Sequence, residues 1–196
     1  MILKMVKGSV DVLTKPSTGT FEKYETDNLT WAVIYVSIGA ALSGVFGAIG
    51  ATMAKAEAVG LIASVIGNVG LTIVAFAIFL GVVYLIATSL FKATGKFGEL
   101  AFDISLYWAP LAVLMSIAIM LSLGIFAWVM APVKLVLFCY NLFLTYLGIQ
   151  AGMNLPRDKA LYVILIPLVA VIVLLVLVGL VLGGTIVALL RGLFGL

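Results

Sequence analysis

The chain has 196 residues, of which 65% are hydrophobic and 10% are charged, and its mean hydropathy is +1.34. A globular domain is about 45 to 50% apolar and about 25% charged, so a soluble protein of this composition would expose large apolar patches and aggregate. The net charge of +3 comes from Lys and Arg residues that are scattered singly between apolar runs. Nucleic-acid-binding proteins gather such residues on one face, so we expect no nucleic-acid partner. The composition predicts an integral membrane protein.

The residue types that carry most catalytic and metal sites are scarce. The sequence contains no His and a single Cys, Cys139, which lies inside an apolar run. This excludes His-based triads, His-ligated zinc sites and metal sites built from several Cys ligands of one chain. We therefore expect no catalytic residue, no metal site and no cofactor.

Residues 1–28 predict a cytoplasmic, interfacial segment. Apolar residues recur mostly at three- and four-residue spacing and polar residues occupy the other face, as in an amphipathic helix at a membrane surface. Lys4, Lys7 and Asp11 interrupt the apolar stretch that a cleaved signal would need. Pro16 suits the first position of a second short helix, with Phe21 and Tyr24 on one face.

Residues 29–196 predict an all-α bundle of about five transmembrane helices, with four and six as alternative counts. A span needs about 20 apolar residues, which places the helices at about residues 30–50, 70–91, 104–127, 131–150 and 161–182. Residues 61–69 precede the second span and form either a short interfacial or re-entrant piece or part of one long helix. The last apolar run exceeds one span, so it must tilt, bend near Pro167 or Gly183, or project beyond the bilayer. Tyr107 and Trp108 are expected at interface depth near the start of the third span.

The distribution of basic residues predicts the orientation. Short cytoplasmic loops are enriched in Lys and Arg. With five spans, eight basic residues fall on the N-terminal side and three on the other: Lys4, Lys7, Lys15, Lys23, Lys92, Lys96, Arg157 and Lys159 against Lys55, Lys134 and Arg191. We therefore expect the N-terminus in the cytoplasm and the C-terminus outside.

Small residues at four-residue intervals mark candidate helix-packing faces. They are Gly39, Ser43, Gly47 and Ala51 in the first span and, as a shorter notch, Gly179 and Gly183 in the last. Such faces let two backbones approach closely. They fit packing within the chain or contact in a homo-oligomer, and we expect the closest contact through Gly39, Ser43 and Gly47.

The fourth span carries the most polar patch inside a membrane helix: Cys139, Tyr140 and Asn141. Hydrocarbon satisfies none of the amide groups of Asn141, so this side chain should face another helix or line a cavity. Lys134 lies one turn into the same span, where its stem can reach the interface or its amine can contact an ion or substrate.

Glu99 and Asp103 are four residues apart at the start of the third span. Like charges at this spacing repel unless something bridges them. The pair fits a solvated helix start, or a contact with a cation, a basic partner or lipid headgroups.

The order of these features resembles the Yip-domain family, the Ypt- and Rab-interacting membrane proteins and their archaeal and bacterial relatives. The resemblance rests on Pro16 followed by Phe21 and Tyr24, the small-residue-rich first span, Gly95 and Gly98 leading to Tyr107 and Pro110, and the segment YLGIQAGMNLPRDKALYVILIPL. It implies five spans with a cytoplasmic N-terminus. Eukaryotic members bind small GTPases and one another in vesicle trafficking and membrane shaping. This chain lacks their long polar tail and Asp-Leu-Tyr-Gly-Pro motif, so the resemblance points to a prokaryotic relative in a cell membrane and does not extend GTPase binding to it.

Two functions from different classes follow. The first is a non-enzymatic scaffold, trafficking or membrane-organising factor that acts through lipids, other membrane proteins or further copies of itself. The alternative is a small transporter or channel subunit with a pathway past Asn141, Tyr140 and Lys134. An enzyme acting at the membrane surface has only Glu99 and Asp103 in its support.

Overall fold

All regular elements in the described part of the chain are α-helices. The computed structural model describes residues 1–54, 60–123 and 126–194, with side chains up to residue 179 except residue 175. The helices, in chain order, are α1 (Ile2–Thr14), α2 (Thr18–Tyr24), α3 (Leu29–Met53), α4 (Leu61–Phe91), α5 (Phe97–Leu121), α6 (Ala127–Gly152) and α7 (Arg157–Phe194). Five of them, α3 to α7, are long and apolar enough to cross a membrane. The all-α, multi-span fold with a short N-terminal helix is therefore confirmed.

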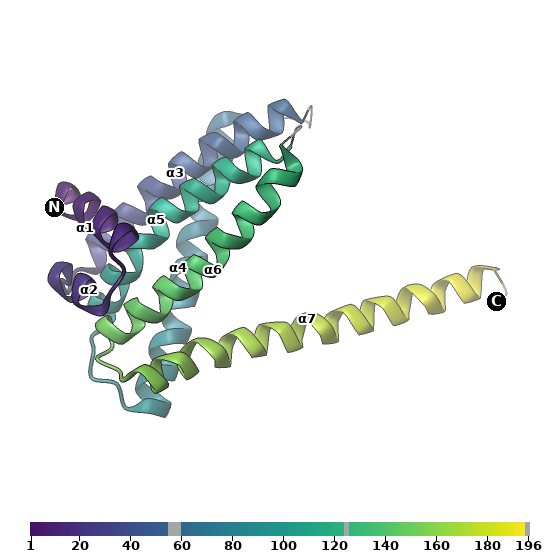
Figure 1. Cartoon of the computed structure of the whole chain (residues 1–196). Helices are drawn as coiled ribbons and strands as arrows, with labels where there is room; N and C mark the ends of the chain where they lie inside the picture. The colour runs from purple at the N-terminus through teal and green to yellow at the C-terminus, as the bar shows by residue number, and fades with distance from the viewer. Residues whose placement is uncertain (55–59, 124–125, 195–196) are drawn as a thin grey trace.

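Helices α3 and α5 form the centre of the bundle and make its most extensive contact. They run in the same direction, because Gly39 meets Ala109 and Gly50 meets Met120 further along both helices. Helix α4 packs on α3, and α6 packs on α5. Figure 1 shows α1 and α2 together at one end of this bundle, beside the start of α3.

Two spans begin well before their expected first residues, and α5 also ends at Leu121, before the expected end at residue 127. Helix α4 is continuous from Leu61 to Phe91, so residues 61–69 extend the span and do not form a separate piece. Helix α5 begins at Phe97, which places Tyr107 and Trp108 about three turns into the span. Tyr107 is fully buried, and the Trp108 ring lies 5.5 Å from that of Phe76 on α4. Both aromatic residues therefore pack against other helices of the bundle, and their expected depth at the interface stays a prediction.

Helix α7 continues without interruption through Pro167. Its 38 residues correspond to about 57 Å at 1.5 Å per residue, nearly twice the thickness of a bilayer core of about 30 Å. Near its start Ala160 and Val163 are buried, and Tyr162 stacks on Phe91 of α4. Figure 1 shows the rest of α7 running away from the other helices.

The two N-terminal helices pack against the spans and form one body with them. Helix α2 begins at Thr18, where the Ser17 side chain accepts a hydrogen bond of 3.1 Å from the Thr20 backbone N–H. Ser17 is therefore the N-cap, and Pro16 precedes the helix, which corrects the expectation that Pro16 opens it. A hydroxyl at this position satisfies one of the free N–H groups of the first turn.

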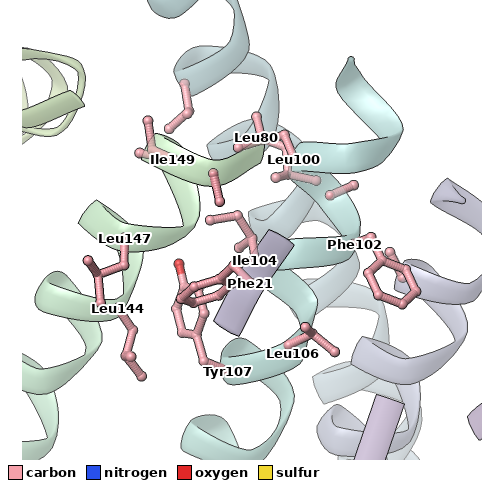
Figure 2. Packing of buried hydrophobic residues seen from close by; sticks show 14 of the residues in the cluster. Phe21, Leu80, Leu100, Phe102, Ile104, Leu106, Tyr107, Leu144, Leu147 and Ile149 are labelled. Atoms are coloured by element: carbon pink, nitrogen blue, oxygen red, sulfur yellow. The ribbon is translucent and has the colours of Figure 1, made fainter. Parts of the chain in front are cut away.

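The apolar core lies at the end of the bundle that carries α1 and α2. Its largest fully buried side chains come from α1, α2, α4, α5, α6 and the residue after α6: Met5, Phe21, Phe76, Leu80, Leu100, Phe102, Ile104, Leu106, Tyr107, Leu144, Ile149 and Met153. Figure 2 shows Phe21 of α2 beside Ile104 and Tyr107 of α5, with Leu144, Leu147 and Ile149 of α6 around them. Residues 100–107, which form the second and third turns of α5, are thus all buried.

Candidate functional site

Helices α1 and α2, here called the N-terminal clamp, present three different surfaces. On α1, Met5 and Val12 are buried against the bundle. Leu3 and Val10 form an exposed apolar flank, with 85% and 54% of their surface accessible. Lys7 is exposed among the polar residues that complete the helix circumference. A helix with one face on protein, one apolar flank and one polar face suits the boundary between protein, lipid and water.

Hydrogen bonds fix α1 to the spans. The hydroxyls of Ser9 and Tyr35 are 2.8 Å apart and connect α1 to α3. The Tyr140 hydroxyl of α6 donates to the Leu13 carbonyl at the end of α1, at 2.7 Å. These contacts hold α1 on helices that are adjacent to opposite sides of α5.

A second group of polar contacts joins α1 to α2. The Tyr24 hydroxyl donates to Asp11 Oδ2 at 2.5 Å, and Lys23 Nζ lies 3.3 Å from the same oxygen. The hydrogen bond from Tyr24 lowers the pKa of the Asp11 carboxyl, and Lys23 lowers it further against the opposing effect of burial. Lys4 of α1 donates to Thr26 Oγ1, just beyond α2. The clamp is therefore held together by ionised and hydroxyl groups at the surface above the apolar core.

Three residues on which the family resemblance rests are Phe21, Tyr107 and Pro110. The first two are in contact, and the third lines a groove nearby. Phe21 packs edge-on against Tyr107, with ring centroids 6.2 Å apart. The Tyr107 hydroxyl donates to Thr145 Oγ1 of α6 at 2.9 Å, which satisfies a polar group in a fully buried site. Pro110 lies one turn further along α5 and lines an apolar groove beside α3. Phe21 and Tyr107 thus anchor α2 to two spans.

The connector between α4 and α5 passes very close to other backbone. A Cβ on Gly95 would lie 2.5 Å from Met153 Cα and would overlap the Gly152 carbonyl at the end of α6. A Cβ on Gly98 would overlap the Asp27 carboxylate. Only glycine fits at both positions, which gives a physical reason for the two glycines in this part of the sequence.

Glu99 and Asp103 have different environments. Glu99 closes a capping box, because its Oε2 accepts from the Lys96 backbone N–H at 3.1 Å, and its Oε1 lies 3.4 Å from Lys96 Nζ. Lys96 also pairs with Asp27 at 3.3 Å. Asp103 is completely buried, so the expectation of a solvated pair is wrong for this residue. The reason is that the start of α5 lies beneath the clamp and the end of α6.

Neither carboxylate oxygen of Asp103 has a hydrogen-bond partner within the described residues. One Glu25 oxygen is likewise buried without a partner. Burial raises the pKa of the Glu25 carboxyl, and the charges of Glu99 and Glu22 raise it further, while Lys96 lowers it. No group of three or more acidic, Cys or His side chains in the described part of the chain could hold a metal ion.

The small residues of α3 divide between contacts and a cavity. A Cβ on Gly39 would lie 2.9 Å from Ala109 Cα of α5, and one on Gly44 would lie 2.9 Å from Val65 Cα of α4. Nothing lies within 4 Å of such an atom on Gly47. Gly47 and Ser43 instead line a cavity of about 370 Å³ between α3, α4 and α5.

Gly39 thus makes a close helix–helix contact, which Gly44 and Gly152 equal, whereas Gly47 makes none, so the expectation of the closest contact through Gly39, Ser43 and Gly47 is wrong for Gly47. Ala51 is half-buried, and a Cβ on Gly179 of α7 would meet nothing within 4 Å. Gly183 lies outside the residues whose side-chain surroundings are described.

Two polar residues that sequence reasoning missed connect α3 and α4. Ser64 Oγ donates to the Gly44 carbonyl at 3.2 Å, and Asn68 Nδ2 donates to the Ala40 carbonyl at 2.6 Å. The donors are four residues apart on α4 and the acceptors four residues apart on α3, as two antiparallel helices require. The sequence did contain a signal for this contact: Ser64 and Asn68 are four residues apart, and so are Ala40 and Gly44.

The polar residues of α6 do not converge. Tyr140 contacts α1, whereas the Asn141 Oδ1 accepts from Thr145 of its own helix at 3.3 Å. Lys134 lies near the other end of α6 and donates to Ser122 Oγ at 3.3 Å. Cys139 is exposed on the outer surface of the helix. A continuous polar pathway through these residues is not formed in the described structure.

The comparisons with known proteins agree with this architecture. The sequence model of the Yip1 domain matches residues 10–179, which is most of the chain and includes the end of α1, all of α2 to α6 and the first half of α7. Searches of curated proteins and of solved structures give no match. The chain has five candidate membrane spans. Because the Yip1 domain covers so much of its length, this multi-pass membrane protein belongs to the Yip1 domain family.

Proposed function

We propose that this protein is a non-enzymatic membrane-organising factor whose N-terminal clamp inserts into one leaflet. The observation that carries the proposal is the exposed apolar flank of α1, at Leu3 and Val10, next to a face that is buried in the bundle. A helix of this kind adds apolar volume to one leaflet when it is partly inserted. Because hydrogen bonds fix α1 to α3 and α6, that insertion is coupled to the position of the spans.

The orientation proposed is N-terminus in the cytoplasm and C-terminus outside. The connector with Lys92 and Lys96 lies against the end of α6, next to the clamp. Basic residues of the clamp and of two connectors therefore gather at one end of the bundle, where they favour the anionic cytoplasmic leaflet. Lipids and other membrane proteins are the proposed partners, and a small GTPase is not among them.

The arrangement of α6 favours this function over transport. A transport pathway needs polar groups that line one connected space, and intramembrane polar residues usually mark it. Tyr140, Asn141 and Lys134 contact three different groups instead. The space beside Asn141 is lined mainly by apolar side chains of α5 and α6.

Sorting by membrane curvature tests the proposal. The labelled protein is reconstituted into vesicles of mixed size, and its density is measured on each vesicle. We expect enrichment on small vesicles, and we expect the double variant Leu3→Glu/Val10→Glu to lose it because the apolar flank becomes charged. The matched control is Lys15→Glu, at an exposed polar position directly after α1, which changes the net charge by the same two units. Equal densities of all three proteins on small and large vesicles would contradict a membrane-organising role of the clamp.

A further inference from the structure

A groove of about 380 Å³ lies beneath α1, between α3 and α5. Val6 of α1 forms one end, and Tyr35 to Leu42 of α3 and Pro110 to Leu114 of α5 form the walls. The groove follows α3 over the eight residues from Tyr35 to Leu42, a rise of about 10 Å. Its volume is within the range of small-molecule sites, about 300 to 1,000 Å³.

The shape of the groove follows from the packing of its floor. Gly39 brings α3 against Ala109 of α5, so the two helices nearly touch at the base. Leu42 and Leu114 remain 49% and 44% exposed along the rim, so the groove opens toward lipid. A concave surface of this kind gives a hydrocarbon chain more contact than the convex side of a helix does.

The lining favours hydrocarbon over a polar molecule. All side chains in it are apolar except Tyr35, and the Tyr35 hydroxyl is already hydrogen-bonded to Ser9. A polar ligand would find no free donor or acceptor among these side chains and would lose its hydration without compensation.

The residue that follows Val6, at the α1 end of the groove, is basic. Lys7 follows Val6 along α1 and is exposed. The nearest acid along this helix, Asp11, is paired with Lys23 and hydrogen-bonded to Tyr24, and its charge is therefore already compensated. Lys7 is thus placed to attract an anionic group at the depth where α1 meets water.

We infer that the groove binds one acyl chain of an anionic phospholipid whose headgroup lies against Lys7. The inference rests on the placement of α1 at the membrane interface, which the proposed function also requires. It adds a defined lipid site, with hydrocarbon between α3 and α5 and phosphate beside α1.

Photo-crosslinking in nanodiscs tests this site. The full-length protein is embedded in phosphatidylcholine with a trace of phosphatidylglycerol that carries a diazirine in its acyl chain, and the crosslinked peptides are mapped. We expect crosslinks in the segments 38–42 and 109–114. Unlabelled phosphatidylglycerol should compete about fivefold better than phosphatidylcholine, which corresponds to about 1 kcal/mol for one basic residue at an anionic surface.

Matched variants separate the two parts of the site. Val6→Trp fills the end of the groove and should reduce crosslinking, whereas Val10→Trp, one turn away on the same flank and outside the groove, should not. Lys7→Gln should abolish the preference for phosphatidylglycerol, whereas Lys15→Gln, also exposed, should retain it. All four positions are exposed, so the melting temperature of each variant should equal that of the unmodified protein. A lower melting temperature would identify a misfolded variant.

Three results would overturn the inference: crosslinks spread evenly over the lipid-facing helices, equal competition by both lipids, or crosslinks from the groove to a second copy of the chain. Such results with α1 still located in the interface would leave the proposed function intact. An α1 helix located in water would contradict both.

Discussion

The contact between Gly39 and Ala109 should be the least tolerant point of the α3–α5 interface. The change Gly39→Ala places a Cβ 2.9 Å from Ala109 Cα, Cβ and O, a separation shorter than real Cβ contacts. Two of these atoms are backbone and cannot rotate away. Overpacking of this kind costs about 1 to 3 kcal/mol.

The matched control is Gly47→Ala on the same helix, where the added atom meets nothing within 4 Å. Both changes gain the higher helix propensity of Ala, about 1 kcal/mol, so the difference between them isolates the contact. Free energies of unfolding measured in one detergent should differ by about 1 to 3 kcal/mol, with Gly39→Ala the less stable variant. Equal stability of the two variants would refute the packing argument.

Three further predictions concern buried polar groups. Asn68→Ala should lower the free energy of unfolding by about 0.6 kcal/mol, the average for membrane interhelical hydrogen bonds, while Thr72→Ala should change it less, because Thr72 makes no hydrogen bond to α3 within the described residues. Asp103→Asn should raise the melting temperature at neutral pH, because a carboxyl without a partner in a fully buried site must either carry an unpaired charge or take up a proton on folding, and an amide needs neither; a lower value would show that the carboxylate has a partner. Because the folded pKa of Glu25 is above its ordinary value of 4.5, the folded state binds more protons, so stability should fall as pH rises above about 4.5, and Glu25→Gln should flatten this part of the profile.

The apolar pattern predicted the spans well because lipid imposes a simple length rule on each helix. It failed at the ends of α4 and α5, where helix continues beyond the stretch that one crossing needs. Residues 61–69 are apolar and form helix equally well inside or outside a bilayer core. Phe97 to Asp103 begin α5 under the cover of α1, the segment after α2 and α6, and that cover is a long-range contact that local sequence does not reveal.

The packing face of α3 was only partly predictable for a related reason. Four-residue spacing identifies a face of small residues but not which partner helix meets each of them. Gly39 contacts α5 and Gly44 contacts α4, while Gly47 faces a cavity. Likewise, the spacing of Glu99 and Asp103 suggests one shared environment. In the structure, Glu99 caps the start of α5, whereas Asp103 is completely buried.

The depth of α1 in the membrane tests the central claim most directly. Spin labels at position 10 or 15, in a Cys139→Ala background, are compared in nanodiscs for collisions with oxygen and with a water-soluble nickel complex. We expect the label at position 10, on the apolar flank, to collide mainly with oxygen in the acyl region, and the label at position 15, at the polar end of α1, mainly with nickel in water. Strong collisions with nickel at both positions would place α1 in water and contradict a clamp inserted into one leaflet.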